Sequence, residues 1–128
     1  LKSYEIPMLF YSPKHLRPGE VDTLTTQIDI APTVLRLLGL SYHAPFFGED
    51  VLHSQRSSHV AFFSHNHDVA LYKDGELAIL GLGKTVQDVF YDAASDSYRP
   101  APANPYLNDL AVAYYQTAFE LFRERRYN

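Results

Sequence analysis

Cysteine is absent from this sequence of 128 residues, and basic residues are scarce. Without cysteine the protein has no disulfide, no zinc site with thiolate ligands and no cysteine nucleophile, and its redox compartment stays undecided. Lys and Arg number 11 against 15 Asp and Glu, which gives a formal net charge of −4. Because nucleic-acid-binding domains usually carry clustered positive charge, we expect no nucleic-acid partner. The longest apolar runs are only a few residues, too short to span a bilayer.

The sequence is rich in apolar and aromatic residues. Hydrophobic residues make up 46% of the chain, with ten Tyr and eight Phe, and this composition excludes a disordered chain. The length suits one domain of ordinary size. The chain opens with Leu1 and Lys2, without Met and without a signal-peptide pattern, close to an expected core strand. We therefore interpret it as a piece of a longer protein.

The first half predicts one buried strand and one helix. Residues 6–11 (IPMLFY) form a short apolar run that is typical of a strand buried on both faces of a parallel sheet. A helix is predicted over residues 29–38, with Asp29 as N-cap, Pro32 in the first turn and Gly39 just after the end. The following segment, 41–58, has no periodicity and predicts a loop with one turn.

The second half predicts an antiparallel sheet and a long helix. Four strands are expected, and they cover residues 60–63, 69–73, 76–80 and 86–92. Asp74 and Gly75 accept the positive φ angles of a type I′ hairpin turn, and residues 95–105 are expected to form a loop. A helix is predicted over 105–126, capped by Asn104. Its apolar residues share one stripe, namely Leu107, Leu110, Ala111, Tyr114, Ala118, Leu121 and Phe122.

His65 and His67 are the most metal-like pair in the sequence. At positions i and i+2 of a strand their imidazoles share one face and could bind one metal ion together. Two imidazoles make only half of a tetrahedral site. The alternative is a polar turn between two strands with both histidines exposed, and we favour that alternative.

Other candidate residues have structural explanations. Asp22, Asp29 and Asp50 could form a carboxylate cluster, but Asp29 fits a helix N-cap and Asp50 fits a turn. A threonine nucleophile requires a neighbouring base, and neither Thr25 nor Thr26 has one close by in the sequence. The remaining candidates lack ligand spacing or fit packing better than binding: His15, His43, His53, His59, Tyr114 and Tyr115.

Several runs resemble the C-terminal part of sulfatase-like enzymes of the alkaline phosphatase superfamily, closest to the lipoteichoic acid synthase and phosphoglycerol transferase type. In that type a strand reading IPL precedes a helix that opens QIDIAPTLL and ends LLG, followed by a GxDLL turn. The matching runs here are residues 6–13 (IPMLFYSP), 27–35 (QIDIAPTVL), 38–40 (LGL), 46–52 (FFGEDVL), 72–75 (YKDG) and 113–116 (AYYQ).

The resemblance implies a metal-dependent enzyme whose chemistry lies outside this chain. Such enzymes bind divalent Mn, Mg, Ca or Zn through Asp, Glu and His, and attack a phosphate or sulfate ester with Thr, Ser or formylglycine. The nucleophile and the last Asp-His metal pair precede the IPL strand, so this chain receives no catalytic residue, cofactor or metal ligand from the family. Lys2 lies near the position of an anion-binding lysine in some sulfatases. The whole enzyme is expected in the inner membrane, with a periplasmic or extracellular catalytic domain.

We therefore expect an α/β fold, or α+β when the chain is taken as a fragment. Residues 1–58 are expected to form the last strand and helix of an alkaline-phosphatase-like α/β sheet, and residues 59–128 a small antiparallel sheet covered by the long C-terminal helix.

The expected role is a scaffold, inactive alone, for an upstream catalytic part of the same protein that acts on phosphate or sulfate esters. The alternative is a non-catalytic module that binds a glycan, a lipid headgroup or a protein. Because residues 6–11 would lack neighbouring strands, we also expect self-association through residues 1–40.

Overall fold

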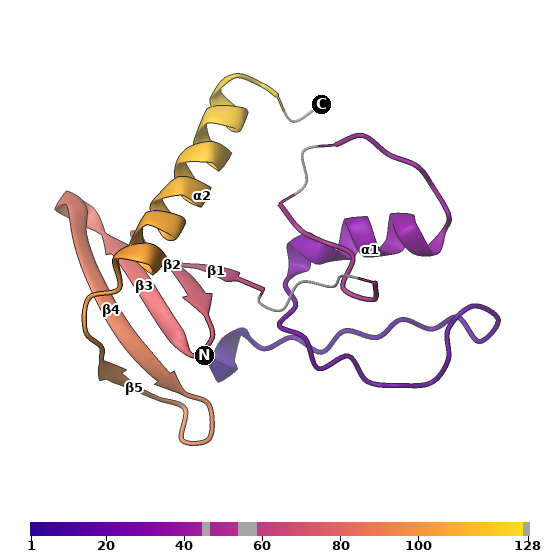
Figure 1. Cartoon of the computed structure of the whole chain (residues 1–128), viewed down its shortest axis with the longest axis horizontal. Coiled ribbons are helices and arrows are strands. Elements are labelled where there is room, and N and C mark those ends of the chain that lie inside the picture. Colours follow the sequence, from indigo (N-terminus) through magenta and orange to yellow (C-terminus); the bar gives the residue numbers. More distant parts are fainter. Residues whose placement is uncertain (45–46, 54–58, 127–128) are drawn as a thin grey trace.

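The computed structural model consists of two unlike parts that lie next to each other (Figure 1). It describes residues 1–44, 47–53 and 59–126. One part is a five-stranded sheet that carries the long helix α2, and the other is the short helix α1 with long connecting segments around it. The predicted boundary at residue 58 lies outside the described residues. Within those residues, no helix is long and apolar enough to cross a membrane.

The sheet is an antiparallel meander in the order β1-β2-β3-β4-β5. Its strands are β1 (Ala61–His65), β2 (Asp68–Lys73), β3 (Glu76–Gly81), β4 (Thr85–Asp92) and β5 (Ser97–Pro100). The first four correspond to the predicted strands. The β2–β3 turn is also confirmed, because Asp74 and Gly75 have φ angles of 51° and 88°, both positive as a type I′ turn requires.

The fifth strand corrects a prediction, since β5 lies in the segment that was expected to be a loop. Tyr98 pairs with Tyr91 and Arg99 pairs with Phe90 across the edge of the sheet. All four residues of β5 are exposed. An edge strand without a buried side has no apolar alternation, so the sequence pattern gives no signal for it.

Helix α2 (Pro105–Arg123) covers one face of the sheet. The predicted cap is confirmed, because the Asn104 side chain accepts a hydrogen bond from the backbone N–H of Leu107 at 3.1 Å. The buried core between helix and sheet consists of Leu71, Ala78, Leu107 and Ala111, surrounded by Val60, Phe62, Leu80, Leu110 and Tyr114. Full burial of a leucine side chain contributes about 2 kcal/mol, so this cluster holds the two elements together.

The apolar stripe of α2 continues past the sheet. Phe119 is 63% exposed and Phe122 is 71% exposed, although Phe122 belongs to the stripe that was predicted to be buried. The helix also ends three residues before the predicted Arg126, because Arg125 adopts a left-handed φ of 54°. The backbone N–H of Arg126 then bonds to the carbonyl of Leu121, which closes the helix end.

The opposite face of the sheet meets the N-terminal residues. The ring edge of Tyr4 packs against Phe63, with ring centroids 5.2 Å apart. The α-amino group of Leu1 donates to the Asp96 carboxylate at 2.8 Å, next to the β4–β5 turn. On that face Leu77 and Val89 are buried, so both faces of the sheet contribute to a core.

Helix α1 (Ile30–Leu37) is confirmed, with a 3₁₀ turn (Gln27–Asp29) in front of it. Gly39 ends the helix with a φ of 67°, as predicted. The N–H of Gly39 bonds to the carbonyl of Arg36, and the N–H of Leu40 bonds to that of Leu35, each at 3.0 Å. This pair of bonds is the Schellman motif that glycine permits at a helix end.

The predicted strand at residues 6–11 does not form, and this expectation was wrong. A parallel strand obtains its hydrogen bonds from neighbours on its edges, and none of the described strands pairs with this run. Its side chains are largely in solvent, with Leu9 86% and Tyr11 83% exposed. The apolar run therefore remains an unpaired connecting segment.

Candidate functional site

The two candidate metal histidines lie at one hairpin but on different elements. His65 ends β1, and its Nδ1 is hydrogen-bonded to the hydroxyl of Tyr4 at 3.1 Å. His67 lies in the turn that leads into β2, after Asn66 with a φ of 54°. Because the turn interrupts the strand, the two imidazoles do not share a strand face as the i, i+2 spacing predicts. Both histidines are exposed in a polar turn.

The carboxylate of Asp29 has a different role from the predicted N-cap. Its side chain is buried, and none of its oxygens caps α1. One oxygen instead accepts the backbone N–H of Thr26 at 2.7 Å and the Thr26 hydroxyl at 2.9 Å. The other accepts the N–H of Glu49 at 2.8 Å. The helical segment begins one turn earlier than predicted, at Thr26, and Asp29 is the acidic third residue that bonds back to the N-cap.

Thr33, one helical turn after Asp29, makes further hydrogen bonds to the backbone of the same loop. Its side chain is fully buried, its hydroxyl donates to the carbonyl of Asp29 at 2.7 Å, and the same oxygen accepts the N–H of Val51 at 3.1 Å. Gly48 allows the loop to come this close, since a Cβ there would lie 2.0 Å from the carbonyl oxygen of Ile28. We call these contacts of Asp29 and Thr33 with the backbone of residues 48–51 the Asp29–Thr33 clamp.

The three candidate carboxylates are not brought together. Asp50 organises the turn after Gly48, as predicted, by accepting the N–H of Leu52 at 3.0 Å and by pairing with His53 Nδ1 at 2.8 Å. Asp22 is exposed on the segment before α1. Across the described residues, no group of three or more His, Cys, Asp or Glu side chains could hold a metal ion.

The remaining predicted residues serve local structure. The Thr25 hydroxyl donates to the carbonyl of Thr23 at 2.8 Å, and Lys2 is exposed in the first turn of the chain. Tyr114 packs against Phe62 with ring centroids 4.8 Å apart. The Tyr115 hydroxyl donates to the carbonyl of Phe63 at 3.0 Å, and burial raises the pKa of Tyr115.

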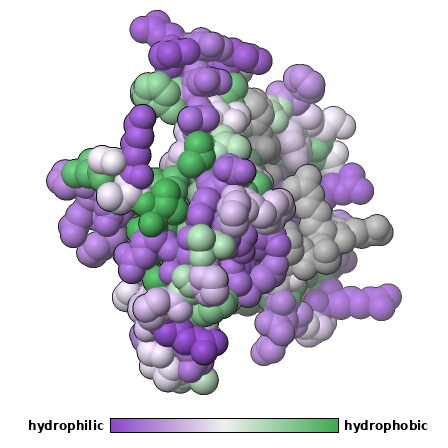
Figure 2. Space-filling model, turned by 60° about the vertical axis from the view of Figure 1, so that its left-hand side comes forward, coloured by the Kyte–Doolittle hydropathy of each residue, from purple (hydrophilic) through white to green (hydrophobic). Residues whose placement is uncertain are grey.

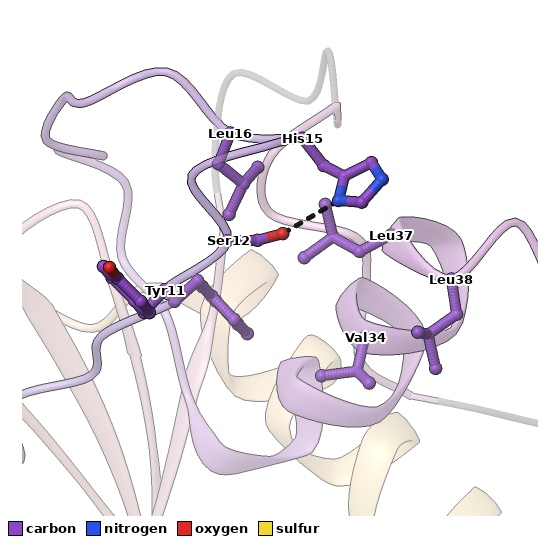
Figure 3. Close-up of a pocket in the computed structure, with 8 residues that line it drawn as sticks. Tyr11, Ser12, His15, Leu16, Val34, Leu37 and Leu38 are labelled. Carbon is purple, nitrogen blue, oxygen red and sulfur yellow. Dashed lines mark hydrogen bonds between the residues drawn. The ribbon is translucent and has the colours of Figure 1, made fainter.

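A cavity with a volume of about 420 Å³ lies between residues 10–16 and α1. Figure 3 shows Ser12, His15 and Leu16 on one side, and Val34 and Leu37 of α1 with the C-cap residue Leu38 on the other. The walls are mainly apolar. The polar group inside is the pair formed by Ser12 Oγ and His15 Nδ1, which are 3.0 Å apart.

A serine beside a histidine is a combination found in hydrolases, but the surrounding groups do not complete it. The N–H groups of His15 and Leu16 both donate to the carbonyl of Ser12, so neither is directed at a substrate oxyanion. In the described structure, His15 has no third group that would orient its ring. We assign the pair to the tight turn at residues 12–15. The sequence signal for this pair is the i, i+3 spacing of Ser12 and His15.

The strongest electrostatic perturbation lies at the β4–β5 turn. The hydrogen bond from the α-amino group of Leu1, followed by that from the Tyr91 hydroxyl, lowers the pKa of Asp96 to about 2. The same hydrogen bond to Asp96 raises the pKa of Tyr91 to about 12. These groups are on the surface, and their hydrogen bonds attach the first residues of this chain to the sheet.

The predicted fold class is confirmed by the five-stranded antiparallel sheet with its long C-terminal helix and by the similarity of the fold to part of a solved structure. A similar solved structure is the crystal structure of a protein in the alkaline phosphatase superfamily from Vibrio parahaemolyticus, with a TM-score of 0.78 and 23% sequence identity. The match covers 84% of this chain and 26% of that chain, so the sequence spans about a quarter of its relative. No protein-family model matches the sequence.

Proposed function

We propose that this chain is a structural part of an enzyme that cleaves or transfers phosphate or sulfate esters with a divalent metal ion. The observation that carries the proposal is the fold similarity to part of an alkaline phosphatase superfamily protein, with a TM-score of 0.78. The resemblance of residues 6–13 and 27–35 to the lipoteichoic acid synthase and phosphoglycerol transferase type supports the finer assignment. That assignment places the enzyme at the cell envelope, in the inner membrane with its catalytic domain outside the cytoplasm.

The role proposed for this chain is a scaffold. The distinctive run QIDIAPT contributes Asp29 and Thr33 to the clamp, where their polar atoms bond to the backbone of the following loop. The described residues do not offer a set of ligands that fits a metal ion. In this proposal the metal ligands and the nucleophile belong to an upstream catalytic part of the same protein, and we derive no reaction step from the residues of this chain.

A non-catalytic binding module is the second candidate. The exposed rings of Phe119 and Phe122 at the C-terminal end of α2 favour it, because exposed aromatic side chains often mark interaction sites. On the face of the molecule in Figure 2, however, apolar surface occurs in separate spots bordered by hydrophilic side chains. A scattered arrangement offers a weaker binding surface than a continuous patch does.

The test compares the longest natural protein that carries this sequence with isolated residues 1–128. Both are assayed on p-nitrophenyl phosphate, p-nitrophenyl sulfate and phosphatidylglycerol, with Mn²⁺ and after treatment with EDTA. We expect the longer protein to convert one of these ester classes, EDTA to abolish the conversion and Mn²⁺ to restore it. The isolated chain is expected to be inactive.

Three results would contradict the proposal. A longer protein that converts none of the esters would exclude the enzyme and favour the binding module. Conversion that survives EDTA would exclude the metal dependence. Conversion by residues 1–128 alone, retained after a second purification, would exclude the scaffold role.

A further inference from the structure

Asn66 lies at the tip of the β1–β2 hairpin, in a turn of two residues. The strands on either side are paired up to His65 and Asp68, so only Asn66 and His67 connect them. Asn66 has a φ of 54°, a left-handed conformation that asparagine tolerates better than most residues. Both strands that form this turn lie within the described residues, and their pairing sets its geometry.

Two groups of this turn that can react with each other are not engaged elsewhere. Within the described residues, neither the side-chain amide of Asn66 nor the backbone N–H of His67 makes a hydrogen bond. Both residues are exposed to solvent. The imidazoles of His65 and His67 flank the amide in the sequence, and imidazole is the side chain that accepts a proton near neutral pH.

We propose that Asn66 is a deamidation site of this protein, since asparagine is one of the chemically labile residues. The backbone nitrogen of His67 attacks Cγ of Asn66, and the new N–Cγ bond closes a succinimide ring. The Cγ–Nδ2 bond breaks, and the proton of the His67 N–H leaves with the amide nitrogen as ammonia. Water, the other reactant, then opens the ring at either carbonyl and gives aspartate or isoaspartate.

The other two asparagines that the structure describes are protected from this reaction. Asn104 precedes Pro105, which has no N–H to close the ring. The amide of Asn108 donates to Asp88 at 3.1 Å. Asp109 follows Asn108 as the fifth residue of α2, so its N–H is bonded within the helix and does not reach the side chain before it.

Asp74 occupies a comparable position in the β2–β3 turn but is less reactive. It is exposed, has a φ of 51° and precedes Gly75. Its side chain, however, is a carboxylate paired with the ammonium group of Lys73. A charged carboxylate is a much poorer electrophile than an amide. Asn66 therefore combines a reactive amide with a free N–H on the next residue.

The reaction changes both the charge and the length of the turn. Aspartate at this position places a negative charge near that of Asp68. Isoaspartate also inserts a methylene group into the backbone of a turn whose strands are paired in a fixed register. We expect the isoaspartate form to lose the pairing between His65 and Asp68 first. The modification does not depend on the proposed enzyme.

The test follows the longest natural protein that carries this sequence during prolonged incubation at neutral pH. Peptide mass spectrometry with fragmentation measures the amide and the acid at each asparagine. We expect the acid to accumulate at Asn66 in the folded protein, while Asn104 and Asn108 keep their amides. In denaturant Asn108 should be converted as well, because its hydrogen bonds are lost, whereas Asn104 should still be intact.

Two variants test the route. Asn66→Gln should abolish conversion at this position. His67→Ile keeps the attacking N–H but crowds it with a β-branched side chain, and should slow conversion several-fold. Asn108→Gln is the matched control and should leave the rate at Asn66 unchanged. A folded protein in which Asn66 keeps its amide would overturn the proposal. Conversion of Asn108 as fast as Asn66 in the folded protein, or an unchanged rate in His67→Ile, would overturn it equally.

Discussion

At the scale of single residues, Asp29 is the buried carboxylate that makes the most hydrogen bonds in the first half of the described chain. Its buried carboxylate accepts three hydrogen bonds, and two of the donors are backbone N–H groups. Hydrogen bonds to a charged group contribute about 1.5–3 kcal/mol each, and buried donors without a partner add a penalty. The residue was expected to be a simple cap because an acidic side chain before a helix is a local pattern. The partner N–H at Glu49 is twenty residues away, so no local sequence pattern predicts this hydrogen bond.

The first prediction concerns this carboxylate. Asp29→Ala should lower the free energy of unfolding by about 3 kcal/mol, more than the loss of a cap alone would, because it leaves the N–H groups of Thr26 and Glu49 unpaired. Asp22→Ala is the control, since Asp22 is exposed and should change stability by less than about 0.5 kcal/mol. Denaturant unfolding measures both. Equal midpoints for the two variants would show that the clamp does not stabilise the fold.

A second prediction concerns Asp88 and Asn108 between the sheet and α2. Asn108 Nδ2 donates to one oxygen of Asp88 at 3.1 Å, but the other oxygen of Asp88 and the amide oxygen of Asn108 are both buried without a donor. Asp88→Asn supplies an N–H₂ group that can donate to Asn108. We expect a gain in stability of about 1 kcal/mol in thermal or denaturant unfolding. Asp88→Leu should instead destabilise the protein, and a loss with both variants would contradict this view.

At the scale of elements, the sequence predicts those elements whose signals are local. Asn104, Pro105 and the apolar stripe that follows predict α2, and Asp74 with Gly75 predicts the β2–β3 turn. The edge strand β5 was not predicted because none of its four residues is buried. The predicted strand at residues 6–11 failed for the opposite reason. Its pattern predicts burial on both faces, which requires helices packed on each side of a larger sheet.

The loop that follows α1 gives a third prediction. Gly48→Ala places a methyl group against the backbone of Ile28, which cannot move aside as a flexible side chain can. We expect a loss of about 3 kcal/mol or more and faster hydrogen exchange at the N–H groups of Glu49 and Val51. Gly19→Ala is the matched control, because nothing lies within 4 Å of the added atom. Unchanged exchange in Gly48→Ala would mean that the loop does not pack closely on α1.

The attachment of the first residues to the sheet gives a pH prediction. Folding lowers the pKa of Asp96 to about 2, so its ionised form stabilises the folded state above the unfolded pKa of about 4. That contribution is lost as the pH falls from about 4 through about 2. For the isolated chain of residues 1–128, which has the α-amino group at Leu1, unfolding curves between these pH values should therefore show a steeper loss of stability than for the Asp96→Asn variant of the same chain. Parallel curves would contradict the docking of Leu1 on Asp96.

At the scale of the whole molecule, the chain combines a sheet and helix with a core of their own and a clamped helix beside a cavity. The fold class was predicted from the resemblance of short runs such as QIDIAPT to a known family, and the residues of this run meet strict hydrogen-bonding requirements in the structure. The clamp explains two of these requirements, at Asp29 and Thr33. The lack of neighbouring strands at residues 6–11 was predicted, but the loss of the strand itself was not, because the apolar pattern of the six residues is the same with or without neighbours.

We propose that this chain supports an ester-cleaving or ester-transferring enzyme without taking part in the chemistry. The most direct test measures kcat and the midpoint of thermal unfolding in the longer natural protein. Two variants are compared with the wild type: Thr33→Val, and the double variant His65→Ala with His67→Ala. Thr33→Val should lower the midpoint by roughly 2–8 °C, since it removes two buried hydrogen bonds, and should keep kcat unchanged below the transition. The histidine variant should keep both values. A fully folded variant of either kind that loses kcat tenfold or more would contradict the account.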